Sequence, residues 1–153
     1  MQVGRSGALT PVAELAPVEV AGVTIARATL HSAAVLARLD ARVGDTVRVE
    51  RAGDVVPGIA GVNLEQRPAD ARPFAFPKDC PACGSTVVAD GGGASLRCPS
   101  DSCPERLRRR VGHFASQAGV GIEGFGPVVM DRLIARGLVR EPVDLYLLRR
   151  EDL

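Results

Sequence analysis

The sequence predicts a multi-module α+β fold, in which a small β-barrel, a compact metal-binding segment and a helical segment follow one another. Three observations lead to this prediction. Short β-branched runs bounded by Gly, Pro and Asp fill the first half, all the cysteines cluster after it, and apolar side chains recur at helical spacing after the last cysteine. Because the composition shifts along the 153 residues, we expect modules at 1–72, 73–104 and 105–153.

The first module, 1–72, has the alternation of short strands. Val47 and Val49 would point to one face of a strand, and Arg48 and Glu50 to the other. Ser32 can cap a short helix over residues 33–39. Three further apolar runs are strand-like: 8–15, 23–30 and 55–64. Four or five short strands with one inserted helix are typical of a closed barrel of the OB type.

The second module contains the four cysteines of the chain. Two residues separate Cys80 from Cys83, and four separate Cys98 from Cys103. Two thiolate pairs on short loops can surround one zinc ion tetrahedrally, and a site filled by four protein ligands is structural, with no open position for catalysis. The segment 73–104 has too few apolar side chains to form a core alone, so we expect the metal to supply the free energy of its folding.

Disulfides and redox chemistry are the alternatives for these cysteines. Four cysteines allow three disulfide connectivities, but residues 1–10 lack the apolar core of a secretory signal peptide. A redox Cys-x-x-Cys pair needs a helix that starts at the motif, whereas residues 84–86 open a strand-like stretch. The spacing therefore favours one structural zinc.

The third module, 105–153, begins with a predicted helix. Pro104 suits its first position, and an apolar stripe follows at Leu107, Val111, Phe114 and Ala118. A neighbouring face gathers Arg106, Arg109, Arg110, His113 and Gln117. Ordinary solvation explains such a face as well as nucleic-acid binding does.

A glycine turn links this helix to a second one. Gly124 and Gly126 flank Phe125, and Pro127 starts a helix that ends at Gly137. Helix, tight glycine hairpin and helix form a helix-hairpin-helix arrangement, whose free backbone N–H groups can hold a phosphate without reading base sequence. By itself this motif is weak evidence, since many tight turns resemble it.

Charge and hydropathy exclude other classes. The formal net charge is +1, and no apolar run approaches the roughly 18 residues of a membrane span. We therefore expect a soluble, cytoplasmic chain with no membrane partner. Aromatic residues make up 3% of the chain and Trp is absent, so base stacking is not expected to be the main mode of binding.

Taken in order, these segments resemble bacterial NAD-dependent DNA ligases. The similarity to that family's OB region lies in residues 3–13, 27–31, 44–45 and 51–57. The four cysteines resemble its zinc finger. The start of its helix-hairpin-helix domain is matched by residues 113–114, 122–126 and 144–146.

The family seals nicks in duplex DNA during replication and repair, with AMP that a lysine of an upstream adenylation domain takes from NAD. The resemblance implies that this chain is the DNA-gripping, non-catalytic portion, with nicked duplex DNA and the adenylation domain as its partners. It also implies that Arg5 and Ser6 contact the DNA backbone near the nick. Charge and the hairpin motif add further expected contacts at Arg51, Arg106, Arg109, Arg110, Gly124 and Gly126. His31 is interpreted as a barrel residue satisfied by hydrogen bonds.

The chain also departs from the family. Nothing matches the Lys-x-Asp-Gly motif of the nucleophile, and the single lysine, Lys78, belongs to the zinc segment. We therefore expect no self-adenylation and no NAD binding by this chain. Smaller departures are Ser6 for the usual Thr, Ser32 for Asn and Gln117 for a basic residue. Two alternatives stay open: a free-standing zinc-stabilised nucleic-acid-binding module and a structural interaction protein.

Overall fold

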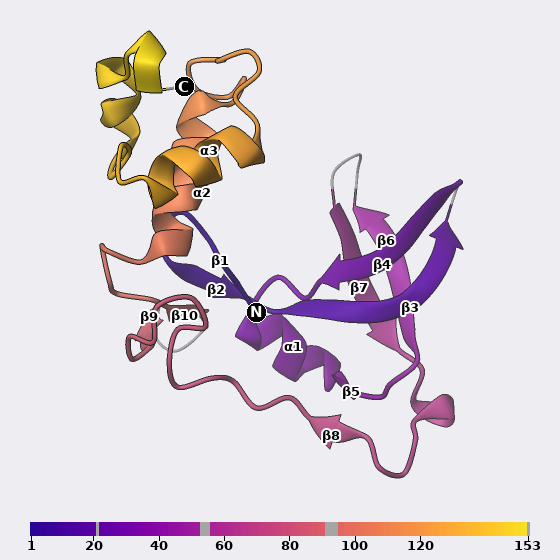
Figure 1. Ribbon diagram of the computed structural model, residues 1–153. Coiled ribbons are helices and arrows are strands. Elements are labelled where there is room, and N and C mark those ends of the chain that lie inside the picture. The colour runs from indigo at the N-terminus through magenta and orange to yellow at the C-terminus, as the bar shows by residue number, and fades with distance from the viewer. Residues whose placement is uncertain (21, 53–55, 91–94, 153) are drawn as a thin grey trace.

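The computed structural model describes residues 1–20, 22–52, 56–90 and 95–152, and Figure 1 shows how their elements are arranged. The sheet of the predicted barrel, called the barrel sheet below, has the order β3-β4-β7-β6, and among the described residues β3 and β6 are its edge strands. Its strands are β3 (Val12–Val20), β4 (Val23–Thr29), β6 (Val47–Ala52) and β7 (Val56–Val62). All neighbours are antiparallel except β4 and β7, which pair in parallel at Thr29 and Gly58. Four buried residues form the centre of this core: Ala28, Leu30, Leu36 and Ile59.

The predicted short helix is confirmed as α1 (Ala33–Leu39). The Ser32 hydroxyl accepts the N–H of Val35 at 3.2 Å, which satisfies one of the free donors at the helix start. Leu36 of this helix is buried in the barrel core, and the half-buried Leu39 packs against the same core. The chain then forms β5 (Arg42–Val43), which pairs with β8 (Arg72–Pro73), and a short 3-10 helix, η1 (Leu64–Gln66), follows β7.

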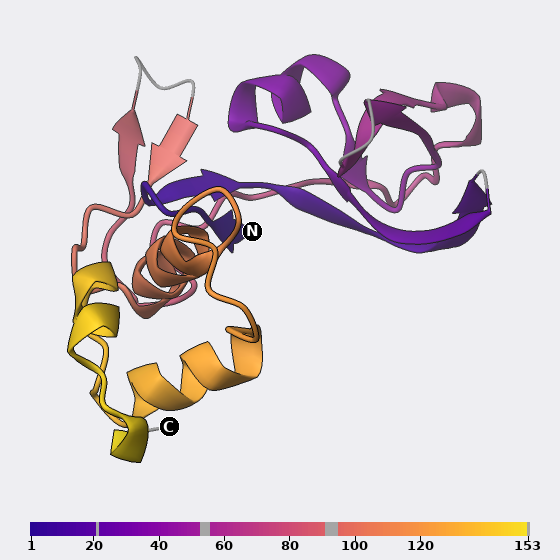
Figure 2. The ribbon, with the colours of Figure 1, turned by 90° about the horizontal axis from the view of Figure 1, so that it is seen from above.

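The first ten residues do not join the barrel sheet. Strands β1 (Gln2–Val3) and β2 (Ala8–Thr10) pair with the hairpin of β9 (Val88–Asp90) and β10 (Ser95–Arg97), in the order β1-β2-β10-β9. The run 8–15, expected as one strand, is thus divided between two sheets, and the chain passes straight from β2 into β3 (Figure 2). Pro11 lies at the division, where it has no N–H to donate to either ladder.

The third part is helical. It contains α2 (Pro104–Ala115), α3 (Pro127–Ala135) and the 3-10 helices η3 (Pro142–Leu147) and η4 (Arg150–Asp152). Buried side chains from α2, α3 and the segment after α3 form its core: Val111, Met130, Leu133 and Val139. Nowhere in the described ranges is there a helix with the length and apolar character needed to cross a bilayer.

Helix α2 is shorter than the sequence predicts. It ends at Ala115, which is buried, whereas Ala118 is exposed and contributes nothing to the apolar stripe. Ser116 closes the helix, since its hydroxyl donates to the carbonyl of His113 at 2.7 Å. The chain then folds back so closely that a Cβ on Gly119 would lie 2.1 Å from the carbonyl oxygen of Phe114. This turn explains why the helical pattern stops before Ala118.

An ion-pair cluster ties the loop after α1 to the chain that leaves β7. The Asp45 carboxylate is fully buried and accepts hydrogen bonds from Nε of Arg67 at 2.8 Å and from the N–H of Arg42 at 2.8 Å. Arg67 also donates from Nη1 to Asp40 at 2.7 Å. Burial alone would raise the pKa of Asp45, but the hydrogen bonds from Arg67 and Arg42 outweigh it, and the pKa lies below its usual value.

This cluster predicts how acid destabilises the barrel. Because the folded-state pKa of Asp45 is lowered, its stabilisation is complete above the unfolded pKa of about 3.9 and is lost as pH falls through the folded value. We expect Asp45→Asn to lower the free energy of unfolding by about 2 kcal/mol at pH 7. Below about pH 3.9 the free energy of unfolding of this variant should depend less on pH than that of the wild type. Urea unfolding across this pH range measures both effects. Asp70→Asn, at an exposed carboxylate, is the control; equal acid dependence in wild type and Asp45→Asn would contradict the prediction.

Candidate metal centre and nucleic-acid interface

The four cysteine sulfurs form one cluster. All Sγ atoms lie within 4.8 Å of one another, with Cys80 and Cys103 separated by 4.0 Å and Cys83 and Cys98 by 3.5 Å. A zinc ion bound by four sulfurs at about 2.3 Å requires tetrahedral edges of about 3.8 Å. The donor set and its spacing therefore fit a single zinc ion.

Local backbone geometry brings each pair of cysteines together. In the first loop, Gly84 has a φ of 72° and its N–H donates to the carbonyl of Cys80 at 2.9 Å, which closes a tight turn. In the second loop, Cys103 precedes Pro104 as the N-cap of α2. Burial raises the pKa of Cys103, and hydrogen bonds from backbone N–H groups of Arg106 and Glu105 at the start of that helix partly offset this effect.

Burial disfavours the thiolate form of two of these cysteines. Cys98 and Cys103 are completely buried and Cys80 nearly so, whereas Cys83 is half-buried. Burial raises the pKa of Cys98 to about 12 and also raises that of Cys103, while hydrogen bonds with Ser85 lower the pKa of Cys83 to about 6. Buried thiolates need a compensating positive charge, which zinc would supply when bound.

The amino-terminal strands cover the cysteine cluster. Val3 of β1 and Leu9 of β2 are buried in the same core as Cys80, Cys98 and Cys103. This sheet was not foreseen, because the expected first module kept residues 1–10 with the barrel. A signal was present in the glycines at 4 and 7, which mark a hairpin turn whose strands needed a partner sheet.

The turn between β1 and β2 carries the first predicted DNA contacts. The N–H of Gly7 donates to the carbonyl of Gly4 at 2.9 Å, and that of Gly4 to the carbonyl of Ala8 at 2.8 Å. Arg5 and Ser6 are exposed at the tip of this turn. The turn is joined directly to the metal site, since the N–H of Cys98 donates to the carbonyl of Gly7 at 2.9 Å.

The other predicted contacts are distributed over three elements. Arg109 and Arg110 are exposed on α2, and Nε of Arg109 donates to Glu105 at 2.9 Å. Gly124 has a φ of 72° and Gly126 is the N-cap of α3. A Cβ at either glycine would meet no atom within 4 Å, so the approach to this turn is open. Arg51 pairs through its backbone with Pro57 between β6 and β7, and its side chain lies outside the described part of the chain.

Arg106 is turned away from solvent. Its side chain is 11% exposed, and its Nη1 donates to the carbonyl of Ser100 at 2.6 Å. Its Nη2 lies 3.1 Å from a carboxylate oxygen of Asp101. The guanidinium therefore binds the second cysteine loop, and this geometry does not support the phosphate contact that charge alone suggested.

His31 also differs from expectation. The side chain is exposed rather than satisfied inside the barrel, and the hydrogen bond at this residue runs from its backbone N–H to Oγ1 of Thr29 at 3.0 Å. The residue has a φ of 59°, a conformation uncommon for a non-glycine residue. With Arg27 and Arg109, His31 lines a hollow of about 480 Å³ between β4, β1 and α2. Sequence reasoning missed Arg27, because only the fold brings it toward α2.

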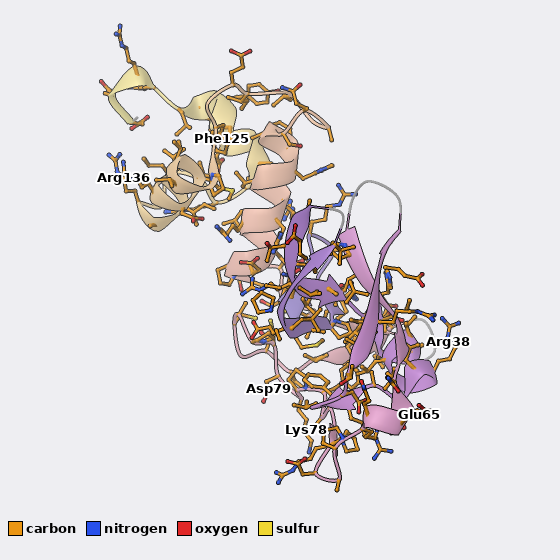
Figure 3. All side chains as sticks on the ribbon, turned by 90° about the vertical axis from the view of Figure 1, so that its right-hand side faces the viewer. Arg38, Glu65, Lys78, Asp79, Phe125 and Arg136 are labelled. Carbon is orange, nitrogen blue, oxygen red and sulfur yellow. The ribbon has the colours of Figure 1, made fainter. Side chains whose placement is uncertain are left out.

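The turn between α2 and α3 is anchored from inside. Phe125 is half-buried and packs against the helical core of Val111, Met130 and Leu133, and Figure 3 shows its place beside the helices. Lys78 is labelled in the same view. It is exposed beside the first cysteine loop and lies far from the helical segment.

Comparisons with known proteins agree with this architecture. Residues 1–71 match the NAD-dependent DNA ligase OB-fold domain, and residues 79–104 match the NAD-dependent DNA ligase C4 zinc finger domain. The chain is 52% identical over 153 residues to DNA ligase 1 of Opitutus terrae, and 53% identical over 153 residues to the DNA ligase of Myxococcus xanthus. It is 47% identical over 154 residues to a DNA ligase of Stenotrophomonas maltophilia. These matches cover 100% of this chain but 23%, 23% and 19% of the three relatives, so the chain spans about a fifth of their length.

The cysteine cluster predicts zinc-dependent folding of a defined part of the chain. We expect about one zinc per chain. Its removal by a chelator should increase hydrogen exchange in β1 and β2 as well as in the cysteine loops, since Val3 and Leu9 pack on the cysteines. The separate barrel core should keep β4 and α1 protected. Elemental analysis and hydrogen exchange measure these effects, and Cys98→Ser should reproduce the chelated state. A metal-free chain with full protection in β1 and β2 would contradict the prediction.

Proposed function

We propose that this chain, which carries the OB-fold and C4 zinc finger domains of the NAD-dependent DNA ligase family, is the DNA-gripping, non-catalytic portion of such an enzyme. It would bind nicked duplex DNA in the cytoplasm during replication and repair, without reading base sequence. The observation that carries this proposal is the placement of exposed arginines on two elements joined at the cysteine cluster. Arg5 lies on the turn that contacts Cys98, and Arg109 and Arg110 lie on the helix that starts at Cys103.

The helical segment supplies a second type of contact. We assign α2, the turn at 116–126 and α3 to a helix-hairpin-helix motif. The first turn of α3 has no side-chain cap, so backbone N–H groups at its start are free to bind a phosphate, and the open space at Gly124 and Gly126 admits one. Backbone contacts of this kind position a protein on a duplex without sequence specificity.

The chemistry of joining would depend on another part of the enzyme. Lys78 is followed by Asp79 and Cys80, so it does not belong to a Lys-x-Asp-Gly motif. In this proposal the adenylation domain is a partner that receives AMP from NAD, and this chain holds the duplex against it. The zinc would act on structure alone, since four cysteines fill its coordination.

Salt dependence tests the proposed DNA contacts. Each arginine that neutralises a phosphate adds about 0.9 to the slope of log affinity against log salt. We expect Arg109→Gln to weaken duplex binding and to lower this slope by about that amount, as measured by fluorescence anisotropy at several salt concentrations. Arg72→Gln is the control, because Arg72 is exposed on β8, far from α2 in Figure 1.

Two outcomes would contradict the DNA contacts. One is an affinity for the duplex that does not change with salt. The other is an equal loss of affinity in Arg109→Gln and Arg72→Gln. Two duplexes of unrelated sequence should bind equally, because phosphate contacts carry no sequence information.

The absence of the nucleophile motif gives a separate prediction. Incubation of the chain with NAD labelled in its adenylate half should leave no AMP on the protein, as judged by gel and by mass spectrometry. Lys78, the single lysine, is the position to inspect. A covalent adenylate on Lys78 would overturn the non-catalytic part of the proposal.

A further inference from the structure

Arg106 lies where α2, the second cysteine loop and the turn between β1 and β2 meet. Its backbone belongs to α2, and its guanidinium reaches the second cysteine loop, with Nη1 2.6 Å from the carbonyl of Ser100 and 3.3 Å from that of Pro99. Nη2 lies 3.1 Å from a carboxylate oxygen of Asp101, whereas Nε is buried without a hydrogen-bond partner among the described residues. All of these partners lie between Cys98 and Cys103, so the side chain closes the loop that presents both cysteines.

The aliphatic part of Arg106 supports the turn that carries Arg5. A Cβ built on Gly7 would lie 3.3 Å from Cδ of Arg106, 3.2 Å from Cγ of Arg97 and 2.5 Å from the carbonyl oxygen of Cys98. Gly7 also has a φ of 91°, and it is buried. Only a glycine lets the turn approach this closely. The turn therefore rests on the Cys98 backbone and on the side chains of Arg97 and Arg106.

We propose that Arg106 is a positioning residue that holds the turn of Arg5 and Ser6 against the second cysteine loop and the start of α2. Its planar guanidinium suits this task, because its donors reach two carbonyls and a carboxylate in fixed directions. Together with the Cys98 backbone and the Arg97 side chain, Arg106 thus helps to set the relation between Arg5 and the exposed face of Arg109 and Arg110. The effect on DNA depends on the proposed function, whereas the effect on the turn does not.

Lysine replacements separate positioning from direct phosphate contact. A phosphate accepts the point charge of lysine, but one ammonium cannot reproduce the fork that binds Ser100 and Asp101. We expect Arg106→Lys and Arg106→Gln to weaken duplex binding alike, by about tenfold, which is within the usual range of coupling between sites. For Arg109, a matched position on the same helix, lysine should rescue most of the affinity that glutamine loses. Rescue by Arg106→Lys would overturn the proposal.

A double-mutant cycle tests the connection with Arg5. If Arg106 acts through the turn, Arg5→Gln combined with Arg106→Gln should bind about as well as the weaker single variant. If Arg106 contacts DNA independently, the two losses should multiply, and this result would overturn the proposal. Circular dichroism and zinc content, measured on each variant, identify any protein that fails to fold.

Hydrogen exchange tests the turn without DNA. Arg106→Lys and Arg106→Gln should increase the exchange of the Cys98 amide, which donates to Gly7 at 2.9 Å, while amides of the barrel strand β4 stay protected. Gly7→Ala should have the same effect, because its Cβ meets the Cys98 carbonyl. Gly137→Ala is its control, with a φ of 70° but no atom within 4 Å. Unchanged exchange at Cys98 in the Arg106 variants would overturn the positioning role, even if wild type bound no DNA and the proposed function failed.

Discussion

The burial of the cysteine sulfurs is the constraint on which the rest of this structure depends. Cys98 and Cys103 are completely buried, and the raised pKa of each reflects the cost of placing negative charge there. A bound cation would remove that cost, and its binding free energy would stabilise the folded cysteine segment. Strands β1 and β2 pack on one side of it, α2 starts from Cys103, and the β9–β10 hairpin completes the sheet.

This centre explains how a chain with small cores can hold distant surfaces together. The barrel and the helical segment have separate clusters of buried side chains. The link between them is the cysteine sheet, which takes β1 and β2 from the amino terminus and adds β9 (Val88–Asp90) and β10 (Ser95–Arg97). A turn with Arg5 and a helix with Arg109 thereby lie on one support, although about a hundred residues separate them in sequence.

Neighbouring arginines on one helix differ in role because their surroundings differ. Arg106 and Arg109 are one turn apart, and both suit a phosphate on charge grounds. Arg106 faces the carbonyls of the second cysteine loop, whereas Arg109 pairs with Glu105 and stays exposed. The carbonyls of Pro99 and Ser100 draw the Arg106 guanidinium inward, since carbonyl groups that leave water need hydrogen-bond donors.

The sequence by itself determined the elements that depend on local chemistry. Near neighbours in the chain predict the cap of α1 at Ser32, the four cysteine ligands and the turn at Gly124. They also predict the helix starts at Pro104 and Pro127. Only the tertiary structure decided what depends on distant pairing. Val3 and Leu9 pack in the cysteine core rather than in the barrel, and Arg106 faces inward. Arg27 and Arg109 line the same hollow. Strand pairing and burial depend on partners far along the chain, and periodicity does not identify those partners.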